Sequence, residues 1–149
     1  MEKEKLAEIE LTYRPSLKFT EQPKIVTSQD AYQVLIKFWD EGKINFIEQF
    51  RIALLNRANY VIGVIELSSG GITGTVADIR LIIAAAIKSN AVAIILAHNH
   101  PSGNLKPSQP DLDLTNKIAG AAKLFDLRLL DHLIVTEDSY LSMADQGLL

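Results

Sequence analysis

The sequence predicts an α/β fold in which helices pack on a mixed β-sheet. After a first helix that begins near residue 27, segments with strand periodicity alternate with segments of helical periodicity in the order β-β-β-α-β-α-β. Residues 91–97 are apolar on both faces, as in a central strand covered by helices on each side. The chain has 149 residues, 48% of them hydrophobic, which suits one domain with a substantial core.

The first part of the chain differs from the rest. Residues 1–26 are polar and form an expected N-terminal extension, and residues 27–149 form the expected domain. Within the extension, residues 9–13 alternate between apolar and polar side chains, which predicts a short edge strand.

A helix and a β-hairpin are expected next. Thr27–Asp30 has the form of a capping box that begins a helix, and Gly42 is expected to end that helix. Apolar residues follow the box at helical spacing: Ala31, Val34, Leu35 and Phe38. Residues 49–55 and 60–67 have strand patterns joined by turn-like residues, and the turn at 68–71 leads to a third short strand.

The second half of the domain alternates between helix and strand. Residues 78–89 and 109–125 predict helices, while 91–97, 127–135 and 140–143 predict strands. The first of these helices has an apolar stripe of Ile79, Ile82, Ile83 and Ala86. The stripe of the second consists of Leu114, Ile118, Ala122 and Phe125.

Composition excludes several classes of protein. The chain has no cysteine, which rules out disulfides, thiolate metal sites and a cysteine nucleophile. Its net charge of −3 and the lack of a basic cluster argue against direct nucleic-acid binding. No apolar segment matches a secretory signal or a membrane span, so we expect a cytoplasmic protein.

The most informative segment follows the apolar strand. His98 and His100 lie two residues apart at its exit, so both imidazoles point to the same face. Pro101 stops the strand, and a loop then leads to Asp111 in the first turn of the next helix, where a carboxylate is favoured. Two imidazoles and one carboxylate leave a fourth tetrahedral position for water, as in catalytic zinc sites.

Two structural interpretations compete with the metal site. Ser108–Asp111 has the form of an ordinary capping box, and the histidines can also form hydrogen bonds at a strand end without binding an ion. The combination of the histidine pair with Asp111 favours the metal interpretation. Two of only three histidines precede a loop that delivers an acid at the start of a helix.

These residues resemble the JAMM (MPN-type) metalloprotease motif H-x-H-P, six residues, S-x-x-D, which runs here from His98 to Asp111. More narrowly, the chain is similar to the RadC family in residues 97–104, 130–134 and 147–149. The resemblance implies a three-layer α/β/α fold similar to the cytidine deaminases. It also implies zinc bound at His98, His100 and Asp111.

The resemblance implies further roles as well. Ser108 matches the position that steadies the oxyanion, and Glu48 matches the upstream general base, with Glu66 as its rival. Asn99 stands where many JAMM proteases carry serine or threonine, as in RadC-type chains. Of the neighbours Asp131 and His132, only one is expected to face the site, and a buried, satisfied core histidine is the preferred interpretation of His132.

The leading function is therefore a zinc peptidase or isopeptidase acting on a peptide or protein. The alternatives are a DNA-repair or mobile-element accessory protein that uses the fold as a binding platform, and a metal-dependent nuclease. The helix-hairpin-helix segment of many RadC relatives is not recognisable before residue 27, which weakens the case for DNA contact. A nucleobase deaminase is disfavoured, because that chemistry uses cysteine ligands.

Overall fold

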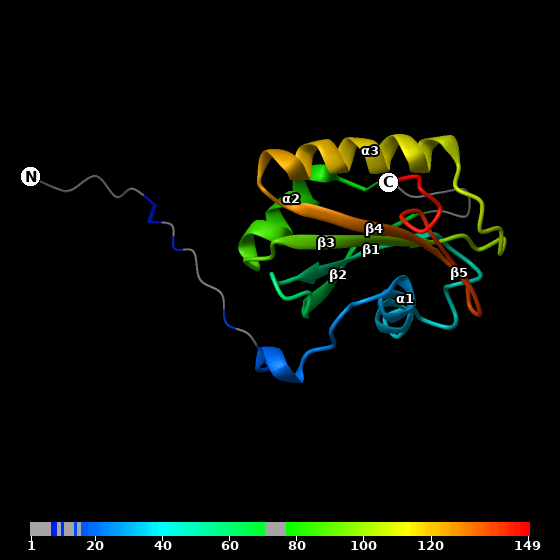
Figure 1. Ribbon diagram of the computed structural model, residues 1–149. Coiled ribbons are helices and arrows are strands. Elements are labelled where there is room, and N and C mark those ends of the chain that lie inside the picture. Colours follow the sequence, from blue (N-terminus) through cyan, green and yellow to red (C-terminus); the bar gives the residue numbers. More distant parts are fainter. Residues whose placement is uncertain (1–6, 9, 11–13, 15, 71–76) are drawn as a thin grey trace, which may run out of the picture.

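The computed structural model describes residues 7–8, 10, 14, 16–70 and 77–149. Within these residues a single mixed sheet has helices on both faces, which confirms the expected fold class (Figure 1). The edge strand expected at residues 9–13 and the third short strand expected after residue 71 fall largely outside the described residues.

The described part of the sheet contains five strands in the order β2-β1-β3-β4-β5. β1 (Gln49–Leu55) pairs antiparallel with both β2 (Val61–Ser69) and β3 (Ala93–Asn99). β3 pairs in parallel with β4 (Arg128–Val135), which pairs antiparallel with β5 (Tyr140–Ser142). β3 is therefore central, and the carboxyl ends of β3 and β4 lie at one edge, where α/β sheets commonly form sites.

Helices form the outer layers. α1 (Ser28–Ile36) covers one face of the sheet, and α2 (Ile79–Lys88) and α3 (Gln109–Leu124) cover the other, as Figure 1 shows. A short 3-10 turn, η1 (Phe19–Glu21), precedes α1. In the part of the chain that the structure describes, no helix combines the length and apolar character needed to cross a membrane.

Helix α1 starts where the sequence predicts but ends earlier. The Thr27–Asp30 capping box is present in both directions. The helix ends at Ile36 rather than Gly42, because the backbone N–H groups of Phe38 and Trp39 donate to carbonyls three residues back and tighten the chain. Trp39 is buried in consequence, and Phe38, expected on the apolar stripe, is exposed.

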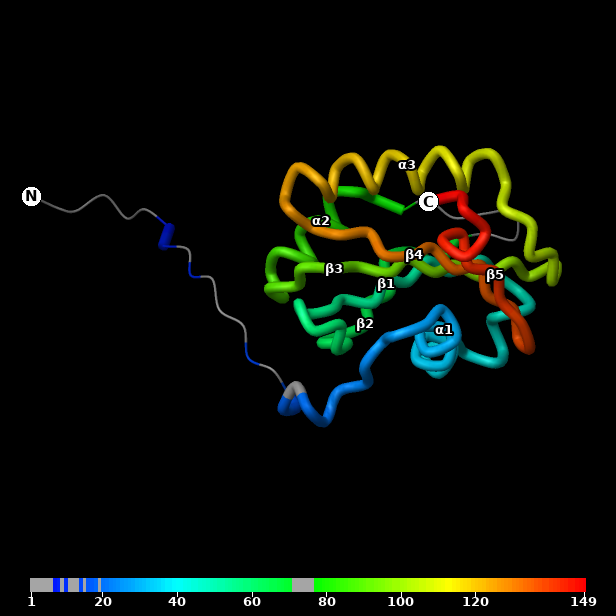
Figure 2. Tube along the Cα trace, in the orientation of Figure 1, coloured from blue at the N-terminus to red at the C-terminus, as the bar shows by residue number. Residues whose placement is uncertain are grey.

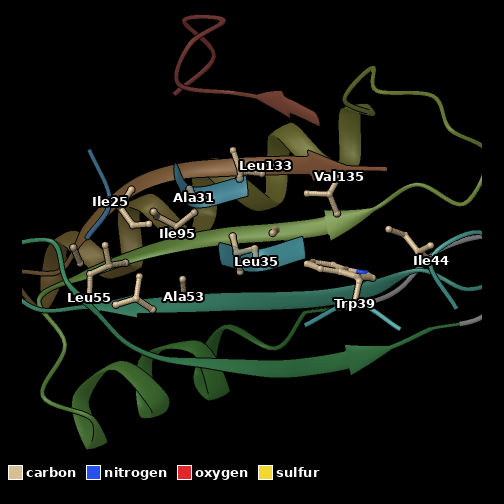
Figure 3. Close-up of a cluster of buried hydrophobic side chains, with 13 residues drawn as sticks. Ile25, Ala31, Leu35, Trp39, Ile44, Ala53, Leu55, Ile95, Leu133 and Val135 are labelled. Carbon is tan, nitrogen blue, oxygen red and sulfur yellow. The ribbon is translucent and has the colours of Figure 1, made fainter. Parts of the chain in front are cut away.

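The sheet separates two apolar cores. Figure 3 shows the first, between α1 and the sheet, to which Leu35, Ile95 and Leu133 contribute. The second lies between the sheet and the other two helices; it includes Ile82, Ile83, Ala86, Ile94, Leu96, Ile118 and Ala122. Phe125, expected in the α3 stripe, is exposed, since the helix ends one residue before it and Asp126 turns the chain with φ of 55°.

The residues after β5 fold back against β4 (Figure 2). The Met143 N–H donates to the carbonyl of His132 over 3.1 Å, and the Met143 side chain is fully buried. The C-terminal segment therefore packs beside the part of β4 that approaches the candidate site.

Candidate metal centre

Four side chains converge at the carboxyl end of β3. Glu48, His98, His100 and Asp111 each offer one ligand atom, and these atoms all lie within 4.8 Å of one another. Glu48 directly precedes β1, His98 is the penultimate residue of β3, His100 follows that strand, and Asp111 lies in the first turn of α3. The structure thus brings together every sequence-predicted ligand and the preferred general base.

The rings of His98 and His100 lie close together in a T-shaped arrangement, with 4.8 Å between their centroids. Their Nε2 atoms are 2.9 Å apart, and the His98 ring stacks on Phe50, its partner across the β1–β3 ladder, at 5.9 Å between centroids. The Nδ1 of His100 lies 2.6 Å from the carbonyl oxygen of Asn104. Since a carbonyl only accepts, this Nδ1 carries a hydrogen, and the Nε2 of the neutral ring presents a lone pair.

Asp111 faces both histidines. Its Oδ1 lies 3.3 Å from the Nε2 of His98, and its Oδ2 lies 3.3 Å from the Nε2 of His100. The same Oδ2 accepts the Ser108 N–H over 2.8 Å, and the Ser108 hydroxyl accepts the Asp111 N–H over 3.2 Å, which completes a capping box. The capping-box interpretation is therefore confirmed, and the same carboxylate still reaches both imidazoles.

The site attracts positive charge. Burial alone would raise the pKa of Asp111, but the imidazoles of His100 and His98 outweigh it and hold that pKa well below its ordinary value. The Asp111 carboxylate in turn raises the pKa of His100, because it stabilises the protonated ring against the opposing effect of burial. Burial also raises the pKa of Glu48, although the nearby histidines oppose that shift.

These residues fit a metal ion. Nitrogen and oxygen ligands about 2.0–2.2 Å from a tetrahedral zinc are about 3.3–3.6 Å from one another. The separations among His98, His100 and Asp111, from 2.9 to 3.3 Å, are close to that edge length. Two nitrogens and a carboxylate are also a ligand set that suits zinc and other divalent ions.

The strand register separates the two candidate general bases. Phe50 lies opposite His98, so Glu48, two residues earlier, is on the same face of the sheet as the histidines. Glu66 pairs with Arg51, on the opposite face. Its carboxylate lies 3.3 Å from the Arg51 guanidinium and accepts from Gln49 over 2.9 Å. Only Glu48 joins the cluster of histidines and Asp111 among the described residues.

Asn99 lies between the two histidines in sequence but points to the α1 face. Its Oδ1 accepts from Trp39 Nε1 over 3.0 Å and from the Gln49 N–H over 2.7 Å. Its Nδ2 donates to the carbonyls of Ile44 and Ile47, each over 2.8 Å. The fully buried carboxamide thus fixes the segment that enters β1 and carries the glutamate of the site.

The remaining predicted residues lie close to the site. Ser108 is exposed, and its hydroxyl hydrogen is not used in the capping bond from Asp111. His132 is buried on the site's face of the sheet, with Nε2 2.7 Å from Nδ1 of His98. Asp131 faces away and accepts from Ser142 Oγ over 2.5 Å. One neighbour of the Asp131–His132 pair therefore faces the site, as strand alternation predicts.

Sequence reasoning missed two contributors. Thr115 Oγ1 forms a hydrogen bond with Nδ1 of His132 over 2.6 Å. Thr115 lies four residues after Asp111, on the same helix face, and this spacing is a signal that could have identified it. Asn104 acts through its backbone carbonyl, so its side chain carries no signal for this contact.

The comparisons with known proteins agree with this geometry. The RadC-like JAB domain family matches residues 25–148, which include all four side chains of the cluster. A UPF0758 protein of Flavobacterium johnsoniae is 42% identical over 125 residues, which cover 84% of this chain and 53% of that protein. A UPF0758 protein of Porphyromonas gingivalis is 42% identical over 146 residues, or 97% of this chain and 63% of that protein.

A third relative, a UPF0758 protein of Clostridium tetani, is 36% identical over 145 residues, which cover 97% of this chain and 62% of that protein. The chain therefore spans less than two thirds of the length of these relatives. The family match nevertheless covers the sheet, all three α-helices of the described residues and the candidate centre. This chain belongs to the RadC-like JAB domain family.

Proposed function

We propose that this protein is a zinc-dependent amide hydrolase of the JAMM type, a peptidase or isopeptidase acting on a peptide or protein. The proposed ligands are His98, His100 and Asp111, whose ligand atoms lie 2.9 to 3.3 Å from their neighbours. Bound there, zinc would activate a water molecule as the nucleophile and polarise the scissile carbonyl.

Glu48 is the proposed proton carrier. Its carboxylate would take a proton from the attacking water and deliver it to the amine nitrogen that leaves, while the C–N bond breaks. Burial raises the pKa of Glu48 and so makes it a stronger base than an exposed carboxylate. The observation that supports the proposal most is the placement of this acid beside the three ligand side chains.

Ser108 is the proposed oxyanion donor. Its hydroxyl oxygen accepts the Asp111 N–H, which orients the side chain and leaves the hydroxyl hydrogen for a donor bond. A hydrogen bond from this group to the carbonyl oxygen would strengthen as negative charge develops in the transition state.

Metal binding is the first test. We expect wild-type protein purified without chelators to contain about one equivalent of zinc by elemental analysis. His98→Ala should lose the metal and remain folded by circular dichroism. Asp111→Asn should also lose it, while its amide oxygen still accepts the Ser108 N–H of the capping box. A wild-type protein that is metal-free and cannot be reloaded would contradict the proposal.

The role of Glu48 is tested by a matched pair of variants. Glu48→Gln should retain zinc but hydrolyse amide substrates about 10²- to 10⁴-fold more slowly, because a carboxamide cannot accept the proton. Glu66→Gln removes the same charge on the other face of the sheet and should leave turnover unchanged. Rates are measured with peptide and isopeptide libraries. Cleavage of nucleic acids but not of amides would refute the proposed reaction.

A further inference from the structure

We propose that Thr115 and His132 hold His98 in the tautomer that presents its Nε2 lone pair to the metal site. This inference rests on the metal site of the proposed function and adds two positioning residues that lie outside the proposed ligand set. It depends on the directions of three consecutive hydrogen bonds, two of them buried and the first partly buried.

The first bond fixes the direction of the others. Thr115 Oγ1 lies 2.6 Å from the backbone carbonyl of Asp111, which only accepts, so the single hydroxyl hydrogen of Thr115 is donated there. The sulfur of Met143 lies 3.6 Å from Thr115 Oγ1, but it is a weak acceptor and competes poorly for the hydroxyl hydrogen. Thr115 Oγ1 must then accept in its 2.6 Å contact with Nδ1 of His132.

The second bond follows from the first. His132 Nδ1 carries the hydrogen that Thr115 accepts, and a neutral imidazole has only one. The ring is completely buried, and burial favours its neutral form. Nε2 of His132 is therefore an acceptor, with the Nδ1 of His98 as its donor at 2.7 Å.

The third step reaches the candidate centre. His98 carries its hydrogen on Nδ1, so its Nε2 lone pair points toward Oδ1 of Asp111 at 3.3 Å and toward the Nε2 of His100. The reverse tautomer would direct an N–H into the site and block coordination by His98. These three hydrogen bonds form a relay that begins at the backbone carbonyl of Asp111, passes through Thr115 and His132 to His98, and ends beside the carboxylate of Asp111.

The matched variants are Thr115→Val and Thr115→Ser. Valine keeps the shape of the side chain but removes the hydroxyl that accepts from Nδ1 of His132. His132 can then adopt the opposite tautomer, with its hydrogen on Nε2, and donate to Nδ1 of His98. Serine retains the hydroxyl and should restore the wild-type state. In the same way, His132→Leu removes the acceptor for His98, whereas the side-chain carbonyl of His132→Gln can accept in its place.

Two measurements report on the inference. Nitrogen-15 spectra of the histidine rings in the metal-free protein reveal which nitrogen of His98 bears hydrogen, and the chain has only three histidines to assign. Zinc affinity is measured by chelator competition. We expect Thr115→Val and His132→Leu to shift His98 toward the Nε2–H form and to bind zinc about 10- to 100-fold more weakly. The serine and glutamine variants should resemble the wild type.

The outcomes separate the inference from the proposed function. Equal His98 tautomers and equal zinc affinities in the valine and serine variants would overturn the inference, even if the wild type binds zinc. A wild type that binds no zinc would refute the proposed function, and the nitrogen spectra alone would then decide the relay. If His132→Leu fails to fold, the Thr115 pair gives the answer.

Discussion

At the residue scale, Asn99 shows how one side chain can serve a site from the opposite face of a strand. The two histidines beside it turn toward α3, while its carboxamide turns toward α1 and satisfies two acceptor and two donor bonds. It holds the start of β1, and with it Glu48, against the end of β3.

Asn99→Asp tests this arrangement. Aspartate has nearly the same shape, but it replaces the two donors with an acceptor that faces the carbonyls of Ile44 and Ile47. We expect a loss of at least about 2 kcal/mol in the free energy of unfolding, since buried carbonyls lose their partners. Urea denaturation measures the loss. Asn116→Asp, at an exposed position of α3, is the control, and equal stability of the two variants would contradict the prediction.

The sequence predicts some residues of the site better than others. Residue spacing and a strand-to-helix context bring His98, His100 and Asp111 forward as candidate ligands, and their contacts are local to one loop. The choice between Glu48 and Glu66 depends instead on which strand pairs with which and on the irregular register between Phe50 and Arg51. Those are long-range features that no local pattern contains.

At the element scale, the helix starts follow from local sequence and the ends do not. The capping boxes of α1 and α3 both form within four consecutive residues, so they are visible in the sequence. The end of α1 at Ile36 accompanies the insertion of Trp39 into the core, where it bonds to Asn99, sixty residues away. The glycine at position 42, from which the helix end was expected, gives no indication of that contact.

The start of α1 leads to a prediction about pH. Backbone N–H groups of Thr27 and Val26 hydrogen-bond to Asp30 and lower its pKa below the ordinary value of 3.8. Because the folded-state pKa is the lower one, the stabilisation is present above the ordinary value and is lost as pH falls through the folded-state pKa.

We therefore expect Asp30→Asn to lower the melting temperature at pH 7, with a difference from wild type that narrows below about pH 4. Thermal melts across this range measure the effect. Glu41→Gln removes one exposed acid outside the capping box and serves as the control. A melting-temperature difference between Asp30→Asn and wild type that stays constant down to pH 2 would show that the ionised Asp30 carboxylate is not its cause.

At the scale of the whole molecule, the layered architecture was predictable but the strand order was not. The strand at residues 91–97 is apolar on both of its faces, which predicts helices on both faces of the sheet. The position of β1 between β2 and β3 depends on packing between segments about forty residues apart, which periodicity does not report.

Metal binding should stabilise the whole fold. A ligand that binds only the native state adds about 2.7 kcal/mol when its concentration is 100 times its dissociation constant. We expect zinc to raise the melting temperature of the wild type, and a chelator to reverse the rise. His98→Ala should melt at the same temperature with and without zinc. A zinc response that persists in this variant would place the binding site elsewhere.

The proposed ligands come from one short loop and its two ends, whereas the glutamate belongs to another segment that Asn99 ties down. Under the proposed function, metal binding and turnover would therefore be separable properties. A preparation that holds a full equivalent of zinc would then still be inactive if the Asn99 contacts at the start of β1 were lost. Metal content alone would not measure the fraction of active protein.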